Sequence, residues 1–350
     1  MARAFPGRRG DVTPDMRGLI DRELERLGRR GHRALVAGMI SGAERSCRGW
    51  SAAGKPPDEL SLFEIGSITK ALTGVLLADM TLHGEVALDD PLSRHLPAPR
   101  PAWRHREPTL LELATHRSGL PNAPPRMTRR ELAYSLGVAR TDPWADVSAA
   151  EYSDRVSRQS PRRAPGGRVR YSSMAVGLLG DALAARAGRR YEDLLRERVL
   201  APLGMEATAV DVAPSWSGRL LDGHSRRGRP MRRLHDFMDA GGGLRSNLHD
   251  MLRFLAACLD PPAEPPGPAL ALAQQPHARI GKRLELGLGW MILNRPRRPR
   301  LVWHNGGTFG FRSFAAFAPG PRAAAVVFSN TARSVDRLGL RLVDEAAAFA

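Results

Sequence analysis

In the stretch "FEIGSITKAL", residues 63 to 72, a lysine follows a serine by three positions. The chain has 53 lysine and arginine residues, and only Lys55, Lys70 and Lys282 are lysines. Arginine therefore occupies almost every cationic position, and Lys70 is an exception. Because a site that needed only positive charge would carry arginine here, the exception points to a role that requires a lysine to lose its proton.

A helix is predicted from Ser67 onward, because apolar residues recur at helical spacing between Ile68 and Met80 and Gly84 supplies a stop. Ser67 and Lys70 then share one helical face, so that the amine lies within reach of the hydroxyl. A neutral lysine can accept the serine proton, and the free N–H groups of a helix start favour the negative charge that develops. Taken alone, the pair also fits a helix cap followed by a surface lysine.

A second candidate site lies in "VRYSSMAVGLLG", residues 169 to 180, where Tyr171 precedes a helix start at Ser172 and Ser173. A tyrosine hydroxyl beside a lysine can relay protons between a nucleophile and a leaving group. The alternative is a half-buried tyrosine before a capped helix.

A third candidate lies in "WHNGGTFGFRS", residues 303 to 313, a predicted strand that ends in His304, Asn305, Gly306 and Gly307. Glycines there let the backbone come close to a ligand, and the N–H of Gly307 can pair with that of Ser67 to hold an oxyanion. The alternative is a glycine-rich hairpin edge.

In this order, Ser-x-x-Lys, Tyr-Ser-Ser and His-Asn-Gly resemble the motifs of the penicillin-recognising serine hydrolases. This family includes serine β-lactamases, DD-peptidases and related esterases and transacylases. The resemblance runs from about residue 32 to the end through phrases such as "LLELATHRSGLP" and "GGGLRSNLHDMLRFL", and looks closest to class C β-lactamases and family VIII esterases. It implies a β-lactamase/transpeptidase-like α/β (α+β) fold.

The resemblance also implies the roles of individual residues. Ser67 would attack an ester or amide carbonyl, Lys70 and Tyr171 would handle its proton, and Ser67 and Gly307 would form the oxyanion hole. The residues implied to bind substrate are Ser173, His304, Asn305 and Gly306.

Two departures from the family motifs bear on the substrate. The family's Tyr-x-Asn becomes Tyr171-Ser172-Ser173, and the hydroxyl of Ser173 cannot serve both the lysine and a substrate amide. The family's Lys-Thr-Gly becomes His304-Asn305-Gly306, which replaces a permanent cation by a side chain that ordinarily titrates near pH 6.5. A β-lactam or peptide that carries a carboxylate would lose the cationic side chain that binds this carboxylate.

We therefore expect a serine hydrolase that cleaves an ester or small amide through an acyl-Ser67 intermediate. Three alternatives remain open on the same fold: a transacylase or amide-forming biosynthetic enzyme, a β-lactamase or D-amino peptidase, and a non-catalytic binding or sensor protein.

The remaining pattern predicts strands at both ends of the chain. Strands are expected at 32–42, 47–52, 287–293, 301–307, 313–319 and 323–330. Helices are expected at 15–30, at a capping box formed by Thr109 and Glu112, at 172–188 and 191–205, after a cap at Ser246, and at the carboxyl terminus, with short helices and loops from 123 to 170. Residues 1–64 and 280–350 would form an α/β domain around an antiparallel sheet, and residues 65–279 a mostly helical domain, with the active site between them.

The composition limits the classes of molecule that the protein is expected to bind. A net charge of +17 is compatible with nucleic-acid binding, but the arginines are spread along the whole chain and only 6% of residues are aromatic, so we expect a small-molecule substrate and no nucleic acid.

Cys47 and Cys258 lie far apart without metal-ligand spacing, so no disulfide, metal or cofactor is expected. Because neither a signal peptide nor a run of about 18 apolar residues is visible, we expect a cytoplasmic protein without a membrane partner. The oligomeric state is not indicated.

Overall fold

The computed structural model describes residues 15–98, 100–124, 126–234 and 237–350. The first 14 residues, on which the expected lack of a signal peptide partly depends, lie outside this range. The helices are α1 Met16–Gly28, α2 Thr69–Leu82, α3 Leu110–Ala114, α4 Met127–Ser135, α5 Ala149–Ser157, α6 Ser173–Ala187, α7 Tyr191–Leu195, α8 Pro214–Ser217, α9 Asp239–Gly242, α10 Leu248–Leu259, α11 Gly267–Ala273 and α12 Asp336–Phe349.

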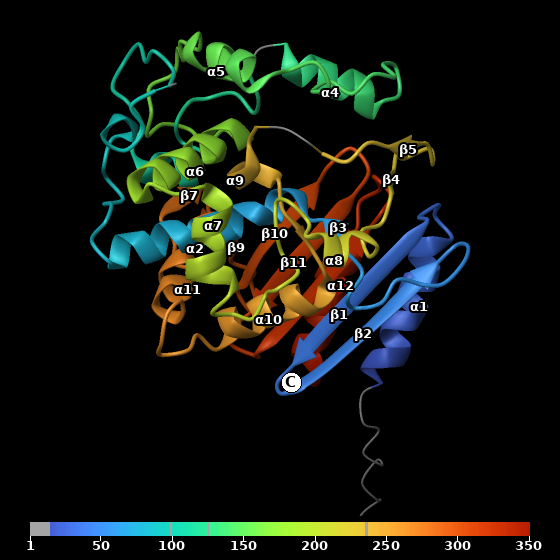
Figure 1. The fold of residues 1–350 in the computed structure, drawn as a ribbon. Helices are drawn as coiled ribbons and strands as arrows, with labels where there is room; N and C mark the ends of the chain where they lie inside the picture. The colour runs from blue at the N-terminus through green and yellow to red at the C-terminus, as the bar shows by residue number, and fades with distance from the viewer. Residues whose placement is uncertain (1–14, 99, 125, 235–236) are drawn as a thin grey trace, which may run out of the picture.

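An antiparallel sheet of eight strands forms the centre of the molecule, in the order β2-β1-β12-β11-β10-β9-β8-β7 (Figure 1). The two chain ends meet where β1 pairs with β12, with Val36 opposite Phe328. The strands are β1 Ala34–Ser41, β2 Glu44–Ser51, β7 Ala278–Ile280, β8 Leu284–Leu286, β9 Met291–Leu293, β10 Leu301–Gly307, β11 Arg312–Ala318 and β12 Ala323–Ser329. Short strands elsewhere are β3 Phe63–Glu64, β4 Gly223–His224, β5 Pro230–Met231 and β6 Arg245–Ser246. The predicted fold class is confirmed.

Both faces of the sheet are covered, which explains why every residue of β1 is buried and why its sequence does not alternate between apolar and polar residues. Leu35 and Met39 belong to the core cluster that includes residues of α1 and α12. Val36 and Ile40 point the other way and join the larger cluster that contains α2, α6 and α10. Figure 1 shows α10 in front of the sheet and α1 behind it. The active-site helix α2 is thus packed into the larger of two cores.

Several boundaries differ from the sequence prediction. The second strand begins at Glu44 instead of Cys47, because β2 pairs with β1 along its whole length. The helix that was expected to follow a cap at Ser246 is instead capped by Asn247. The side chain of Asn247 accepts a hydrogen bond from the N–H of Asp250 at 2.8 Å. Ser246 instead ends the short strand β6.

The segment 287–293 is a strand only from Met291, because Gly289 has a positive φ of 71° and ends regular pairing there. Two further strands, β7 and β8, lie before it and were not predicted. The capping box of Thr109 and Glu112 is confirmed, as are short helices between residues 123 and 170. The division into domains at residues 64 and 280 stays a prediction.

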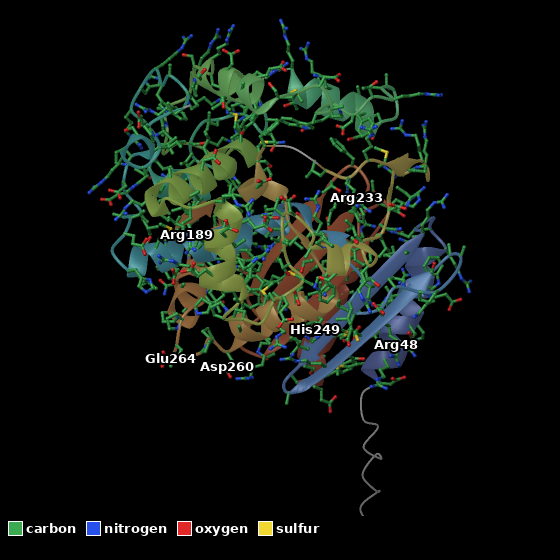
Figure 2. The ribbon with its side chains drawn as sticks, viewed as in Figure 1. Arg48, Arg189, Arg233, His249, Asp260 and Glu264 are labelled. Carbon is green, nitrogen blue, oxygen red and sulfur yellow. The ribbon has the colours of Figure 1, made fainter. Side chains whose placement is uncertain are left out.

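The positive charge of the chain is distributed over the described surface. Figure 2 labels Arg48, Arg189 and Arg233, which come from three distant parts of the sequence and lie well apart. Many arginines pair with acidic neighbours on the same element, as Arg155 does with Glu151 at 2.6 Å. In the part of the chain described, no helix has both the length and the apolar character needed to cross a membrane.

Candidate active site

Ser67 lies in a single turn of 3-10 helix, η1 Gly66–Ile68, that leads directly into α2. The sequence prediction began the helix at Ser67, and the structure begins the α-helical part at Thr69. The backbone of Ile65, the residue before this turn, is fixed from two sides: its N–H donates to the carbonyl of Leu244 at 3.1 Å, and its carbonyl accepts the hydroxyl of Ser313 at 2.7 Å. The candidate nucleophile is therefore held by the sheet and by the loop before β6.

The turn η1 crosses the end of β10 at close range, and glycine makes this possible. Gly66 has a φ of 52°, and a Cβ at this position would lie 2.7 Å from the backbone nitrogen of Gly307. A side chain would therefore push η1 and β10 apart. The crossing brings the backbone of Gly66, the residue before Ser67, next to that of Gly307, which is compatible with the predicted oxyanion hole.

The N–H of Gly307 points away from the neighbouring strand β11. Thr308 donates its N–H to the carbonyl of Phe311, so these two residues form a hydrogen-bonded pair of the β10–β11 ladder. Because such pairs alternate in an antiparallel ladder, the next pair, Gly307 opposite Arg312, does not exchange hydrogen bonds. On the other side, β9 pairs with β10 only as far as Trp303. The N–H of Gly307 is thus directed to an edge that β9 does not cover.

Lys70 is fully buried at the start of α2, and its amine meets three oxygen atoms. Its Nζ lies 3.1 Å from the hydroxyl oxygen of Ser67 and 3.1 Å from that of Ser173, and it donates to the carbonyl of Gly241. The carbonyl comes from α9, which packs tightly on α6: a Cβ at Gly241 would lie 2.6 Å from the carbonyl oxygen of Ser173. Three distant segments of the chain thus converge on one amine.

This arrangement suits both protonation states of Lys70. A neutral amine donates two hydrogen bonds, which Gly241 and Ser173 can accept, and keeps one lone pair for the hydroxyl proton of Ser67. An ammonium donates three hydrogen bonds, and all three neighbours have oxygen lone pairs to accept them. A proton can therefore move from Ser67 to Lys70 without rearrangement of the neighbouring groups.

Tyr171 contacts Lys70 through its ring, with 4.9 Å between Nζ and the ring centroid. The ring also packs against His116, with 4.4 Å between centroids, and lies 6.3 Å from His304. His116 accepts a hydrogen bond from the N–H of Ser172 through Nδ1, so its ring proton sits on Nε2. The structure places His116 directly behind Tyr171.

His304 is buried under the site and is not among the residues that line the cavity. Its Nδ1 donates to the carbonyl of Asn305 at 2.6 Å. Burial, together with the positive charge of Lys70, lowers the pKa of His304 to about 3, and burial with Lys70 and His304 does the same for His116. Both imidazoles are therefore neutral at physiological pH, so position 304 does not supply the cation that the family's lysine would.

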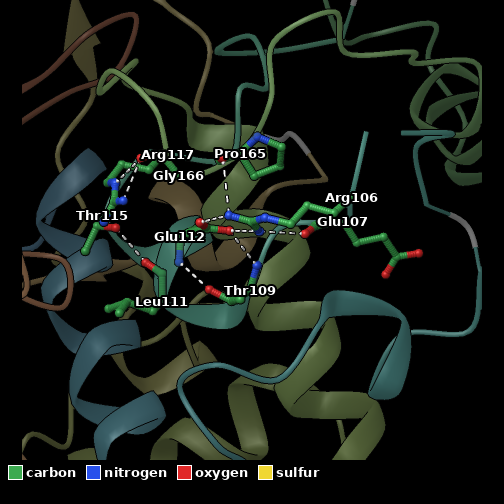
Figure 3. Close-up of polar contacts among 9 residues, drawn as sticks. All are labelled: Arg106, Glu107, Thr109, Leu111, Glu112, Thr115, Arg117, Pro165 and Gly166. Carbon is green, nitrogen blue, oxygen red and sulfur yellow. Dashed lines mark hydrogen bonds and ion pairs between the residues drawn. The ribbon is translucent and has the colours of Figure 1, made fainter. Parts of the chain in front are cut away.

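The segment that carries Tyr171 is tied to α3 by the network in Figure 3. Arg106 donates to the carboxylate of Glu112 at 2.7 Å, and the same carboxylate accepts the N–H of Thr109 in the capping box. Arg117 donates to the carbonyl of Gly166 at 2.6 Å. The N–H of Arg170 donates to the carbonyl of His116 at 2.8 Å. The chain just after α3 thus holds the residues that precede Tyr171.

A cavity of about 460 Å³ opens over these residues. The predicted site residues that line it are Ser67, Tyr171, Ser173, Asn305, Gly306 and Gly307. Sequence reasoning missed several further lining residues, among them Asn122, Gly241, Arg312 and Asp336. Arg312 donates from Nη1 to the carbonyls of Thr308 and Phe311, each at 2.7 Å, and burial lowers its pKa. Gly241 and Arg312 lie inside quoted stretches but were not singled out there, and Asn122 and Asp336 belong to no quoted motif.

Comparisons with known proteins agree with this geometry. The sequence model of the family described as Beta-lactamase matches residues 17–348. The chain is 29% identical over 282 residues to the D-alanyl-D-alanine-carboxypeptidase/endopeptidase AmpH of Escherichia coli K12, which covers 76% of this chain and 70% of that protein. It is 26% identical over 310 residues to a β-lactamase of the same organism, covering 79% and 77% of the two chains.

A β-lactamase of Pseudomonas fluorescens is 23% identical over 354 residues, covering 90% of this chain and 94% of that protein. The family match thus extends over both ends of the central sheet and the helical region between them. It includes all three motifs around the cavity. The chain belongs to the β-lactamase family and is a serine hydrolase.

Proposed function

We propose that the protein hydrolyses esters or small amides through an acyl intermediate on Ser67. The observation that carries this proposal is the buried amine of Lys70, 3.1 Å from the hydroxyl of Ser67, with two further oxygen partners that stabilise it before and after proton transfer. Lys70 takes the proton of Ser67 as the hydroxyl attacks the carbonyl carbon. The N–H groups of Ser67 and Gly307 bind the carbonyl oxygen as it becomes negative.

The proton then passes to the leaving group when the tetrahedral intermediate collapses. We assign its relay to Tyr171, which lines the cavity and whose ring centroid lies 4.9 Å from Nζ of Lys70. Water attacks the acyl group in the second half of the reaction and releases the acid. The cavity is large enough for a small molecule, which supports a small ester or amide as the partner of this site.

A neutral His304 favours substrates that do not depend on a cation at that position. Arg312, however, brings a positive charge to the same cavity, so carboxylate-bearing substrates belong in the test. The relatives named β-lactamase and D-alanyl-D-alanine-carboxypeptidase/endopeptidase make β-lactams and D-alanyl-D-alanine peptides the obvious members of that class. A cytoplasmic location stays a prediction, to be checked by fractionation of the source cells.

The test is turnover of short acyl p-nitrophenyl esters, combined with intact-protein mass spectrometry after incubation with esters, β-lactams and a phosphonate probe. We expect ester turnover with a covalent mass increase that peptide mapping assigns to Ser67, and neither in Ser67→Ala. Added amine or alcohol acceptors would show whether acyl transfer competes with hydrolysis. If the wild-type protein neither turns over any ester nor gains mass at Ser67 with any probe, the proposal is wrong.

A further inference from the structure

The helix α4 and the hairpin of β4 and β5 border one side of the active-site cavity. Glu131 and Ser135 of α4 line the cavity, and the hairpin runs into Leu234, which lines it as well. The ring of Tyr134 in α4 packs edge-on against Phe309, another lining residue, with 4.9 Å between ring centroids. Figure 1 shows α4 and β5 on the same side of the molecule. Two segments that are distant in the sequence therefore meet beside the cavity.

The hairpin is attached to α4 through Tyr134. The N–H of Arg232 donates to the hydroxyl of Tyr134 at 3.3 Å, and the guanidinium of Arg229 donates to the carbonyl of Tyr134 at 3.1 Å. The same guanidinium lies 5.2 Å from the centroid of the Tyr134 ring. These contacts fix the two segments relative to each other, so that their exposed side chains form one continuous surface.

This surface is strongly basic. Residues 126–131 and 222–233 contain eight arginines, and their only carboxylates are those of Glu131 and Asp222. We call these arginines the arginine rim: Arg126, Arg129, Arg130, Arg226, Arg227, Arg229, Arg232 and Arg233. None of them is among the residues that line the active-site cavity, so the charge lies beside the cavity and not inside it.

Most of this charge is not neutralised by the protein itself. Arg233 pairs with Asp222 at 3.9 Å, and both side chains are more than half exposed, so this ion pair is weak. Among the residues that the structure describes, no carboxylate lies within ion-pair distance of the other seven rim arginines. The neighbouring helix α5 is different, because its Arg158 pairs with Asp154 at 2.8 Å. The arginine rim is therefore available to an anionic ligand.

The arrangement of the arginine rim indicates what kind of anion it suits. A single carboxylate carries one charge and gains little from an exposed cation. A phosphate carries up to two charges and three acceptor oxygens, and a guanidinium binds two of these oxygens at once. Several exposed arginines can each contribute to binding a ligand with more than one phosphate charge. Because the reacting carbonyl must reach Ser67 inside the cavity, the phosphate must be joined to it by an arm.

We propose that the arginine rim binds phosphate groups that the substrate carries on an arm away from its scissile bond. This inference rests on the proposed function and narrows its substrate class to phosphorylated esters or thioesters, of which a coenzyme A thioester is an example. The rim arginines are then substrate-binding residues, and they take no part in the chemical step at Ser67.

The experiment compares two pairs of substrates that differ in their phosphate groups. Acetyl-coenzyme A is matched with S-acetylpantetheine, which has the same thioester and the same arm but no phosphate. The p-nitrophenyl ester of 6-(phosphonooxy)hexanoic acid is matched with that of 6-methoxyhexanoic acid, so that the phosphate lies in the acyl half. Spontaneous hydrolysis is subtracted, and kcat/KM is measured for each substrate.

The decisive variant replaces three exposed rim arginines by glutamine: Arg226→Gln, Arg227→Gln and Arg232→Gln. It leaves the contacts of Arg229 with Tyr134 in place, and Arg232 contacts Tyr134 only through its backbone. The matched control replaces three exposed arginines of the region around α1, which lies behind the sheet in Figure 1: Arg17→Gln, Arg22→Gln and Arg30→Gln. Both variants lose the same net charge.

In the wild-type protein at an ionic strength of about 20 mM, we expect kcat/KM of the phosphorylated substrate to exceed that of its neutral partner by about tenfold or more in at least one pair. The rim variant should reduce this ratio about five- to tenfold, the size expected for three exposed ion pairs, and the control should keep it. A loss of activity common to both substrates cancels in the ratio.

The inference is wrong if the wild-type protein shows no preference for the phosphorylated member of either pair. It is also wrong if the rim variant keeps the preference, or if the control loses as much of it as the rim variant does. These failures are distinct from that of the proposed function, in which the wild-type protein turns over none of the four substrates and is not acylated at Ser67.

Discussion

Tyr171 presents its ring to Lys70 and lines the cavity next to Ser67. A ring in van der Waals contact with an amine contributes packing and a favourable charge interaction, whereas proton relay requires the hydroxyl. The two contributions can therefore be separated by a substitution that removes only the oxygen.

We expect Tyr171→Phe to lower kcat/KM for p-nitrophenyl esters by roughly 10²- to 10⁴-fold, the range typical of a lost general acid–base group, with little change in thermal unfolding. Tyr152→Phe is the matched control, because Tyr152 is buried and does not line the cavity. Ester turnover in Tyr171→Phe close to that of the control would show that the ring alone matters.

The short helix α3 contributes Leu110 and Leu113 to the larger core and also helps to position the segment before Tyr171. Glu112 caps this helix and pairs with Arg106, and the residues after the helix hold the chain before Tyr171. Glu112 is buried, and Arg106 is about half exposed, so part of the pairing energy is screened by water.

Glu112→Ala should lower the free energy of unfolding by about 1–3 kcal/mol, because it removes a helix cap and leaves Arg106 and the N–H of Thr109 without their carboxylate. Activity should fall as well, since the segment before Tyr171 loses its support. Glu112→Gln keeps an oxygen for Thr109 and should retain more of both properties. Denaturant unfolding and ester kinetics measure the two effects, and wild-type values in Glu112→Ala would contradict this assignment.

Elements with a strong repeating pattern were predictable from the sequence. The long helix α2, the strands β1, β10, β11 and β12, and the capping box of α3 all follow from local periodicity or spacing. The strands β7 and β8 were missed because each has three residues and gains its regularity only from pairing with its neighbours. The cap at Asn247 instead of Ser246 depends on the pairing of β6 with β3, which is a contact across distant residues.

The candidate site was predictable where a motif is local, as for Ser67 and Lys70. Tyr171, Ser173 and Gly307 were expected at the site from their motifs and the family resemblance, and they line the cavity.

Other contacts between distant segments were not predictable. The carbonyl of Gly241 reaches Lys70 across 171 residues of sequence, and Asn122 reaches Ser173 across 51. The depressed pKa of His304 likewise follows from its burial and from Lys70, neither of which the strand sequence reveals.

Across the whole molecule, three buried histidines couple stability to pH. Burial and nearby positive charge lower the pKa to about 4 for His32 and to about 3 for His116 and His304, each below the ordinary value of 6.5. The unfolded chain therefore binds more protons than the folded chain between about pH 3 and 6.5. These histidines support full stability above pH 6.5, and their contribution is lost as the pH falls through this window.

His304→Asn tests this coupling. Each such histidine adds about 1.4 kcal/mol per pH unit to the slope of unfolding free energy within the window, so the variant should show a shallower slope by about this amount between pH 4 and 6. The slope is the measured quantity, because the substitution also changes the absolute stability. Urea unfolding at several pH values provides it, and identical slopes in the two proteins would mean that His304 does not titrate in the expected range.

The proposed reaction depends on the step in which Lys70 takes the proton of Ser67. Single-turnover acylation by a p-nitrophenyl ester, followed by release of p-nitrophenol and by mass spectrometry of the acyl enzyme, tests it most directly in Lys70→Arg and Lys70→Ala. An arginine keeps the positive charge but does not give up its proton, so we predict that Lys70→Arg is acylated about as slowly as Lys70→Ala. Acylation of Lys70→Arg at the wild-type rate would contradict the account.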